Sequence, residues 1–480
     1  MSTSSPVAAN SLFGASSSAA ATPRGLPRLA GPDDVPPRPS FFRFLLHGSD
    51  NLLTFFPPEC FQEEILGVKR LGRMFFTISH PEGVRRVLID NVTNYPRSTH
   101  VRRLVEPAAR NGLLVTDDEK WRRQRRTMAP SFDVRSVKRY FPIVIEETQS
   151  LLEKWDALSP GSVVDILPDM LRLTLSIIAR TMFSIDAPEI RDIVRDSIHR
   201  YQTEAKVPVA DLVGLPDWFP RGSWNARVAE RVFADFNRVI SRLIEERRAG
   251  GGTERDDLLS RLIAARDEAT GESMPTEEVR DQVITMFWAG HETTAFSLTW
   301  TWYLIAQHPA VRAELEAELA EVLGGRAPDY EDQDKLVYTK MVFQEALRLY
   351  PPVYTLARQA VNDDVIMDRK IPAGSRVAVV PWIIHRHARF WDRPHEFDPE
   401  RFTSANSAKR IRFTYLPMGG GPRVCIGSAL AYLEANSVIA MIAARYRMRL
   451  APSQKIVPQG LVTLGPQHGM RMILERRAAA

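Results

Sequence analysis

Apolar residues recur at helical spacing along most of the chain, with polar residues between them. Between positions 134 and 155 one helical face consists of Val144, Leu151, Leu152 and Trp155. The same spacing returns at positions 225–247 and ends before three glycines at 250–252, residues that commonly follow a helix. The pattern predicts long helices that bury one face.

The longest helical pattern begins at Thr276, which we expect to cap it, and continues to about Gln307, before His308 and Pro309. The next helix should stop at Gly324, and its apolar stripe consists of Val311, Leu315, Leu319 and Val322. Helices of this length predict a mainly α-helical protein.

Strand patterns are short and few. Residues 75–78 predict one strand, and Pro81, which suits a first helical position, begins a helix through Leu88. Weaker strand signals occur at 376–380 and near 462–464. The predicted fold class is therefore mainly α with small β-sheets.

Two segments fall outside these elements. Residues 1–38 are rich in Ser, Ala and Pro and predict a disordered tail. The remaining residues, 39–480, show no repeat or internal linker and predict one large domain. Within it, a break rich in Pro, Gly and Trp at 208–222 is long enough to be a mobile lid.

Composition fits a globular protein of a reducing compartment. Of 480 residues, 44% are hydrophobic and 25% charged, which is ordinary for globular chains. The two cysteines, Cys60 and Cys425, form no C-x-x-C pair, so neither a disulfide framework nor a zinc ribbon is available. We expect a cytoplasmic protein, because no uncharged apolar run reaches the roughly 18 residues of a membrane span and the tail lacks a secretory signal.

Two features leave alternatives open. The tail has no acidic residue before Asp33 and also resembles an organelle transit peptide, so organelle targeting is a second possibility. The net charge of +5 is uneven, with basic residues concentrated between Arg97 and Arg139. Such a face could attract nucleic acid, anionic lipid or an acidic protein, or could simply be solvated.

Candidate chemistry is concentrated in the segment Met-Gly-Gly-Gly-Pro-Arg-Val-Cys-Ile-Gly at positions 418–427. Glycine permits positive φ and close backbone approach, so several N–H groups can turn toward the sulfur of Cys425. This indicates a metal thiolate, with Arg423 able to reach an anionic group beside the metal and Gly427 leaving room for a flat ligand. The alternative is a buried free cysteine in a glycine-rich loop.

The long helix carries polar residues at its centre, Ala-Gly-His-Glu-Thr-Thr at 289–294. Buried polar groups without partners cost about 1–3 kcal/mol, so their presence indicates use. Glu292 and Thr293 form an acid–alcohol pair able to pass protons, and Gly290 would leave space for a diatomic ligand. The alternative is a packing site with threonine hydroxyls bonded to the preceding turn. A zinc protease is excluded, because Ala295 replaces the second histidine of H-E-x-x-H.

Two further motifs carry charge. Glu345 and Arg348 lie three residues apart on one helical face, and Arg401 follows later in Pro-Glu-Arg-Phe. The alternative for the first pair is a surface ion pair of little energetic value. Trp121 and Arg125 form W-x-x-x-R, in which indole and guanidinium are both donors, which suits a carboxylate.

Together, these motifs resemble those of the cytochrome P450 family. The segment at 418–427 matches F-x-x-G-x-R-x-C-x-G except that Met418 replaces the phenylalanine, and 289–294 matches [AG]-G-x-[DE]-T-[TS]. The motifs occur in the family's order along the chain. The resemblance implies one cytochrome P450 haem domain over 39–480.

The resemblance implies a role for each motif. Cys425 would be the axial ligand of the iron of haem b, with O2 as co-substrate. Glu292 and Thr293 would relay protons, and Glu345, Arg348 and Arg401 would lock the cysteine loop in place. The other residues implied to contact haem are Arg423, Trp121, Arg125, Arg358, Gly421, Gly427, Ala289 and Gly290. The residues implied to line the substrate pocket are Ala289, Val353 and Thr463.

The implied activity inserts one oxygen atom of O2 into a lipophilic substrate, using two electrons. The chain has no G-x-G-x-x-G fingerprint, so electrons ultimately from NAD(P)H would arrive through a separate ferredoxin- or flavodoxin-type partner with its reductase. The arginine-rich segment 122–126 would face that partner. A fatty acid, terpenoid, steroid or aromatic substrate would each suit the apolar pocket.

Three other functions stay open at this point. A thiolate-haem isomerase, dehydratase or peroxygenase would keep the fold and need no reductase, although the intact acid–alcohol pair argues against it. A haem-based sensor would give no product. A nucleic-acid binder would leave the cysteine loop unexplained, and we expect no nucleic-acid partner.

Overall fold

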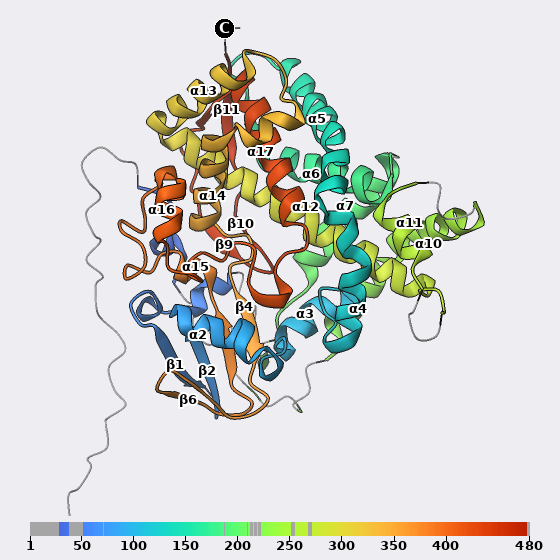
Figure 1. Ribbon diagram of the computed structural model, residues 1–480, viewed down its shortest axis with the longest axis vertical. Coiled ribbons are helices and arrows are strands. Elements are labelled where there is room, and N and C mark those ends of the chain that lie inside the picture. Colours follow the sequence, from blue (N-terminus) through green and yellow to red (C-terminus); the bar gives the residue numbers. More distant parts are fainter. Residues whose placement is uncertain are drawn as a thin grey trace, which may run out of the picture.

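The structure is a computed structural model and describes residues 28–37, 51–70, 72–186, 188–208, 210, 211, 215, 218, 222–250, 255–266 and 271–477. Helices fill most of the molecule, as the spacing of apolar residues predicted (Figure 1). The α-helices are α2 (Pro81–Arg85), α3 (Thr99–Ala109), α4 (Asp118–Met128), α5 (Val134–Asp156), α6 (Ile166–Phe183), α7 (Pro188–Glu204), α9 (Trp224–Val232), α10 (Ala234–Ala249), α11 (Leu258–Ala264), α12 (Thr276–Gln307), α13 (Pro309–Leu323), α14 (Val337–Leu349), α15 (Pro381–Ile384), α16 (Ser404–Lys409) and α17 (Ser428–Arg445).

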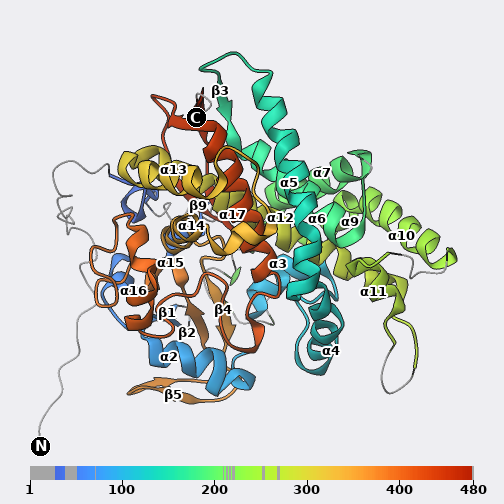
Figure 2. The same cartoon turned by 45° about the horizontal axis from the view of Figure 1, so that its top comes forward.

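The strands form small separate sheets, which also agrees with the predicted fold class. The largest has the order β1–β2–β7–β4, and the others are β3–β11–β8, β9–β10 and β5–β6. In both Figure 1 and Figure 2, β1 and β2 lie with α2 at one side of the molecule. The strands are β1 (Ile65–Arg70), β2 (Arg73–Ile78), β3 (Val163–Asp165), β4 (Leu356–Gln359), β5 (Asp364–Ile366), β6 (Arg369–Ile371), β7 (Arg376–Val379), β8 (Tyr446–Leu450), β9 (Pro458–Gly460), β10 (Leu464–Pro466) and β11 (Arg471–Arg476).

Helix α12 forms the centre of the helical part and packs against α6, α10, α14 and β10. Most of its 32 residues are buried on all sides, as expected of a helix inside a large core. Pro275 occupies the position before the helix and Thr276 is the first helical residue, so the prediction that Thr276 caps the helix is wrong. The hydroxyl of Thr276 instead accepts a hydrogen bond from Arg248 at 3.0 Å.

Most other predicted elements are present with small changes of boundary. The helix over 134–155 is confirmed as α5, and α13 ends at Gly324, whose φ is +55°. The pattern at 225–247 is divided into α9 and α10 because Phe233 leaves the helical conformation between them. The helix that begins at Pro81 changes after Arg85 into a π-helical turn, Arg86–Asp90.

Two strand predictions have different outcomes. The strands near 75–78 and 376–380 are confirmed as β2 and β7, which pair in parallel. The prediction at 462–464 is wrong for residues 462 and 463, which form the turn between β9 and β10. The turn contains the apolar residues Leu461 and Val462 just before Leu464 of β10, so its composition resembled that of a strand.

The N-terminal segment and the predicted lid lie only partly within the described residues. Residues 28–37 differ from the predicted disordered tail, because the N–H of Ala30 donates to Tyr303 and its carbonyl accepts from Tyr350. In the 208–222 segment, Asp211 is buried and pairs with Arg103 and Arg376 at 2.6 and 3.1 Å. The remaining tail and most of the lid lie outside the described residues. Among the helices that are described, none has the length and apolar character that crossing a bilayer requires.

Candidate active site

The loop that carries Cys425 requires glycine at two positions. Gly419 and Gly421 have φ of +74° and +69°, which residues with a side chain rarely adopt. A Cβ on Gly421 would lie 2.1 Å from the carbonyl oxygen of Leu88, so any larger residue would displace backbone. The N–H of Cys425 donates to the carbonyl of Met418 at 2.9 Å and closes the loop just before α17.

The thiol of Cys425 is exposed, yet its surroundings disfavour the charged form. Desolvation raises its pKa, while the N–H of Gly427 and the positive charge of Arg125 act in the opposite direction. A Cβ on Gly427 would have the ring of Phe132 as its nearest neighbour, at 3.7 Å, an ordinary packing distance.

Trp121, Arg125 and Arg423 converge near this loop. The guanidinium of Arg423 lies 4.4 Å from the centre of the Trp121 ring, and that of Arg125 lies 5.7 Å from it. Arg423 also forms an ion pair with Asp117, which precedes α4, at 2.5 Å. Desolvation lowers the pKa of both Arg125 and Arg423. The structure therefore brings the predicted W-x-x-x-R residues together with the arginine of the cysteine loop.

Two more arginines lie beside the same carboxylate. Arg358 is almost fully buried in β4 and forms an isolated β-bridge with Arg97, which is 3.7 Å from Asp117. Burial and the charge of Arg423 lower the pKa of Arg97 to about 9 and that of Arg358 to about 10. The cluster has more positive than negative charge. Sequence motifs missed Arg97 and Asp117; the excess of basic residues after position 97 was a signal for Arg97, and no pattern pointed to Asp117.

Ala289 and Thr293 are less buried than most residues of the central part of α12. Ala289 is exposed, although the residues immediately before it, 281–288, are buried. The hydroxyls of Thr293 and Thr294 donate to the carbonyls of Ala289 and Gly290 at 2.7 and 3.1 Å. These bonds to the preceding turn are those of the packing alternative. A role of Thr293 in proton transfer therefore stays a prediction.

Gly290 has a packing reason of its own. A Cβ at this position would lie 2.7 Å from Cδ1 of Ile178, on α6. Glycine thus permits the close approach of α12 and α6. The side that a methyl group would occupy faces α6, so the predicted space for a small ligand gains no support from this contact.

Glu292 points toward the hairpin of β9 and β10. Its Oε2 accepts a hydrogen bond from the hydroxyl of Thr463 at 2.6 Å. Burial raises the pKa of Glu292 to about 7, against the smaller lowering effects of Thr463 and Gln202. Val353, another of the three predicted pocket residues, is 37% exposed. The contact joins the predicted pocket to the acid of α12.

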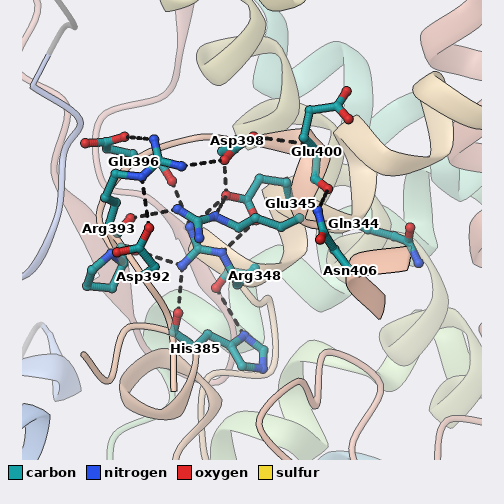
Figure 3. Close-up of polar contacts among 12 residues, drawn as sticks. Gln344, Glu345, Arg348, His385, Asp392, Arg393, Glu396, Asp398, Glu400 and Asn406 are labelled. Atoms are coloured by element: carbon teal, nitrogen blue, oxygen red, sulfur yellow. Dashed lines mark hydrogen bonds and ion pairs between the residues drawn. The ribbon is translucent and has the colours of Figure 1, made fainter. Parts of the chain in front are cut away.

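Glu345 and Arg348 form a buried network (Figure 3), and Arg401 also belongs to it. Arg348 donates two hydrogen bonds to the carboxylate of Glu345, at 2.6 and 2.7 Å, and neither side chain is exposed. Nε of Arg401 lies 3.4 Å from the same carboxylate. The other N–H groups of Arg348 donate at 2.7–2.8 Å to the carbonyl oxygens of His385, Pro394 and Glu396.

His385, which sequence motifs missed, connects this network to the cysteine loop. Its Nδ1 lies 3.1 Å from the carbonyl of Arg348, and its Nε2 accepts from the N–H of Leu416 at 2.8 Å. Burial and the charge of Arg348 lower the pKa of His385 to about 3, so the ring is neutral and can donate from Nδ1. Because Met418 follows Leu416 by two residues, the network sets the start of the loop.

Comparison with known proteins identifies the class to which this geometry belongs. The model of the family described as Cytochrome P450 matches residues 32–468, and the chain belongs to the cytochrome P450 family. Family membership makes the protein an oxidoreductase of the monooxygenase type, and it implies a haem-iron cofactor, O2, a redox partner and a lipophilic substrate.

Individual relatives cover most of the chain. Cyclooctatin synthase of Streptomyces melanosporofaciens is 38% identical over 85% of this chain and 88% of its own. Cyclooctat-9-en-7-ol 5-monooxygenase of the same organism is 33% identical over 78% of this chain and 80% of its own. The crystal structure of the cytochrome P450DA heme domain has 28% identity and a TM-score of 0.77, covering 87% of this chain and 90% of that chain.

Proposed function

We propose that this protein hydroxylates a lipophilic ring compound, with Cys425 as the ligand of the haem iron. The observation that carries the proposal is the glycine-rich loop of Cys425, whose Arg423 joins a buried group of arginines with too few carboxylates. This group of arginines borders the loop at 418–427.

The residues around this loop suit haem on chemical grounds. Arg97 and Arg423 share the carboxylate of Asp117, and Arg358 adds a third buried positive charge. The propionates of haem would neutralise the excess, because guanidinium groups bind carboxylates with strong paired hydrogen bonds. A metal would stabilise the thiolate of Cys425, which desolvation otherwise disfavours.

The protein's own residues would supply protons and exclude water. When bound through a thiolate, haem iron supplies the activation of O2 and the transfer of one oxygen atom. With a pKa of about 7, Glu292 can hold or release a proton near neutral pH, which suits a proton donor. Thr293, the next residue of α12, would take up that proton at its hydroxyl oxygen and release its own hydroxyl proton into the pocket.

The names of two relatives support the substrate class. They refer to cyclooctatin and to cyclooctat-9-en-7-ol, and the second describes a 5-monooxygenase. In this chain the proposed pocket residues Ala289 and Val353 are apolar, and Thr463 adds one hydroxyl. A ring hydrocarbon with few polar groups would suit this lining.

Electrons would arrive through a separate ferredoxin- or flavodoxin-type protein and its reductase, ultimately from NAD(P)H. On α4, the side chains of Arg122 and Arg126 are more than half exposed and lie 3.1 and 3.5 Å from Glu119. Arg123 instead forms an ion pair within the protein, with Glu278 of α12 at 2.9 Å. We therefore place the docking of an acidic partner on Arg122 and Arg126. A reducing compartment, proposed to be the cytoplasm, would keep the thiolate of Cys425 available.

Replacement of each cysteine tests the proposal. Cys425→Ser should abolish the red-shifted Soret band of the reduced carbonyl complex, whereas Cys60→Ser, the matched control, should retain it. A band that persists in Cys425→Ser contradicts the ligand assignment. Product formation from ring compounds should require NAD(P)H and surrogate redox partners. Turnover without a reductant would instead favour an isomerase, and absence of any product would favour a sensor.

A further inference from the structure

We propose that Thr463 is a positioning residue for Glu292: its hydroxyl holds the carboxyl on the side of the β9–β10 hairpin, so that proton delivery depends on a segment of the proposed substrate pocket. The inference rests on the proposed function, because it takes Glu292 as the proton donor.

The two members of the acid–alcohol pair have different partners in the structure. Glu292 is almost fully buried, and its Oε2 accepts from Thr463 at 2.6 Å. The hydroxyl of Thr293 donates to the carbonyl of Ala289 at 2.7 Å. Consecutive residues of a helix point in directions about 100° apart, so the carboxyl and the hydroxyl face different neighbours. The carboxyl must therefore turn away from Thr463 before it can serve Thr293.

The turn that carries Thr463 is held from both sides. Before it, the carbonyl of Leu461 accepts from the hydroxyl of Tyr354 at 2.7 Å. After it, the N–H of Leu464 donates to the carbonyl of Pro352 at 2.9 Å, and the carbonyl of Leu464 accepts from Trp300 of α12 at 3.3 Å. These bonds fix the position of the Thr463 hydroxyl relative to α12.

The same turn presents apolar surface next to the anchored hydroxyl. Leu461 of this turn and Val353, which follows Pro352, are each 37% exposed. A lipophilic substrate that contacts this surface would press on the turn and alter the Thr463–Glu292 contact. Binding of substrate and release of the acid would thereby be linked.

The groups around the carboxyl are neutral. The amide of Gln202, from α7, lies near enough to the carboxyl to lower the pKa of Glu292. His291, on the same helix, makes its contact with the carbonyl of Phe287 at 2.7 Å, and burial lowers its pKa to about 4. No charged side chain of the described chain contributes to the pKa of Glu292. The hydroxyl of Thr463 is thus the main group that favours the carboxylate form.

Infrared titration of the purified protein tests the contact without requiring turnover. The carbonyl stretch of the protonated Glu292 carboxyl should lose half its intensity near pH 7, and Glu292→Gln should remove that band. Loss of a hydroxyl donor to a carboxylate disfavours the charged form, so Thr463→Val should move the midpoint upward by about one pH unit. Thr463→Ser should keep the native midpoint, since it retains the hydroxyl.

Controls make the result specific. Thr299→Val removes a buried hydroxyl of α12 that bonds to the carbonyl of Ala295 at 2.8 Å, and it should leave the midpoint unchanged. Thr463→Ala provides a second variant without the hydroxyl if the valine variant does not fold. Equal midpoints in the native protein and in the valine or alanine variant would overturn the proposal, as would an equal shift in Thr463→Ser.

A second readout separates this inference from the proposed function. With surrogate redox partners, Thr463→Val should increase the ratio of peroxide to product and move the alkaline limb of product formation to higher pH, and Thr463→Ser should restore both. A shifted infrared midpoint in a protein that forms no NAD(P)H-dependent product would retain the positioning role and reject the proposed function. An unshifted midpoint in an enzyme that forms product would reject the positioning role and retain the proposed function.

Discussion

The network around Arg348 and the polar group around Glu292 are both buried, but they differ in the number of partners that each charge has. Arg348 donates five hydrogen bonds, two of them to Glu345. The carboxyl of Glu292 accepts one hydrogen bond, from Thr463, and its pKa is raised to about 7. The charge of Arg348 therefore has a full set of hydrogen-bond partners, whereas the carboxyl of Glu292 has few.

This difference indicates that the Arg348 network stabilises the fold, whereas the group around Glu292 is suited to proton transfer. A buried ion pair with all donors used holds its surroundings in one arrangement, and removal of one member is costly because the other charge stays buried. A buried acid with few partners titrates near neutral pH, which makes it suitable for moving protons. We therefore expect changes in the first region to reduce stability and changes in the second to alter pH dependence and coupling.

The largest effect should follow from Arg348→Ala. Glu345 would remain buried without its main partner, so the free energy of unfolding should fall by about 3–5 kcal/mol. Urea denaturation measures the change. The matched control is Arg393→Ala, because Arg393 is half-exposed and its pairs with Glu396 and Asp398, at 2.7 and 3.0 Å, lie partly in solvent. For Arg393→Ala the free energy of unfolding should fall by less than about 1 kcal/mol. Equal losses in the two variants would contradict a special role of the buried Arg348 network in stability.

Glu292→Gln should flatten the pH dependence of stability. The pKa of Glu292 is about 7 in the folded protein and near 4.5 when unfolded, so the folded state binds the extra proton. Stability from this group is fully present below about pH 4.5 and is lost as pH rises through about 7, a change of about 3 kcal/mol. Urea denaturation across this range measures the slope. An unchanged slope in the variant would show that Glu292 titrates at its ordinary pKa.

Gly290→Ala should have an intermediate effect. The new Cβ would meet Ile178 at 2.7 Å, and overpacking of this kind costs about 1–3 kcal/mol. Adding Ile178→Ala should recover part of the loss, as measured by thermal unfolding. Gly250→Ala is the control, since its Cβ would have only the carbonyl of Glu246 nearby, at 3.6 Å. Failure of the second substitution to recover stability would mean that the α6 contact is not the cause.

Thr293→Val and Thr294→Val should have the smallest effects on stability, below about 1 kcal/mol each, because both hydroxyls only return a bond to the preceding turn. Their effects on coupling should differ. Thr293→Val should release more peroxide per NAD(P)H consumed while substrate still binds, and Thr294→Val should not. Equal coupling in the two variants would remove the proton-relay role of Thr293.

Local sequence predicted some of these contacts and not others. Glu345 and Arg348 lie three residues apart, so any helix at this position places them on one face. The positive φ of Gly421 was likewise expected from its setting in a glycine-rich loop. His385 and Thr463 were different, because no periodic pattern connects them with Leu416 or Glu292. Arg97 also lay outside every motif.

By itself, the sequence determined the helical segments, the glycines of the cysteine loop and the motifs that indicate the family, because each depends on residues close together in the chain. Only the tertiary structure decided which groups these residues contact. Thr463 and Glu292 are 171 positions apart, and a hydrogen bond over that separation forms only when the packing of β10 on α12 has brought its two ends within reach.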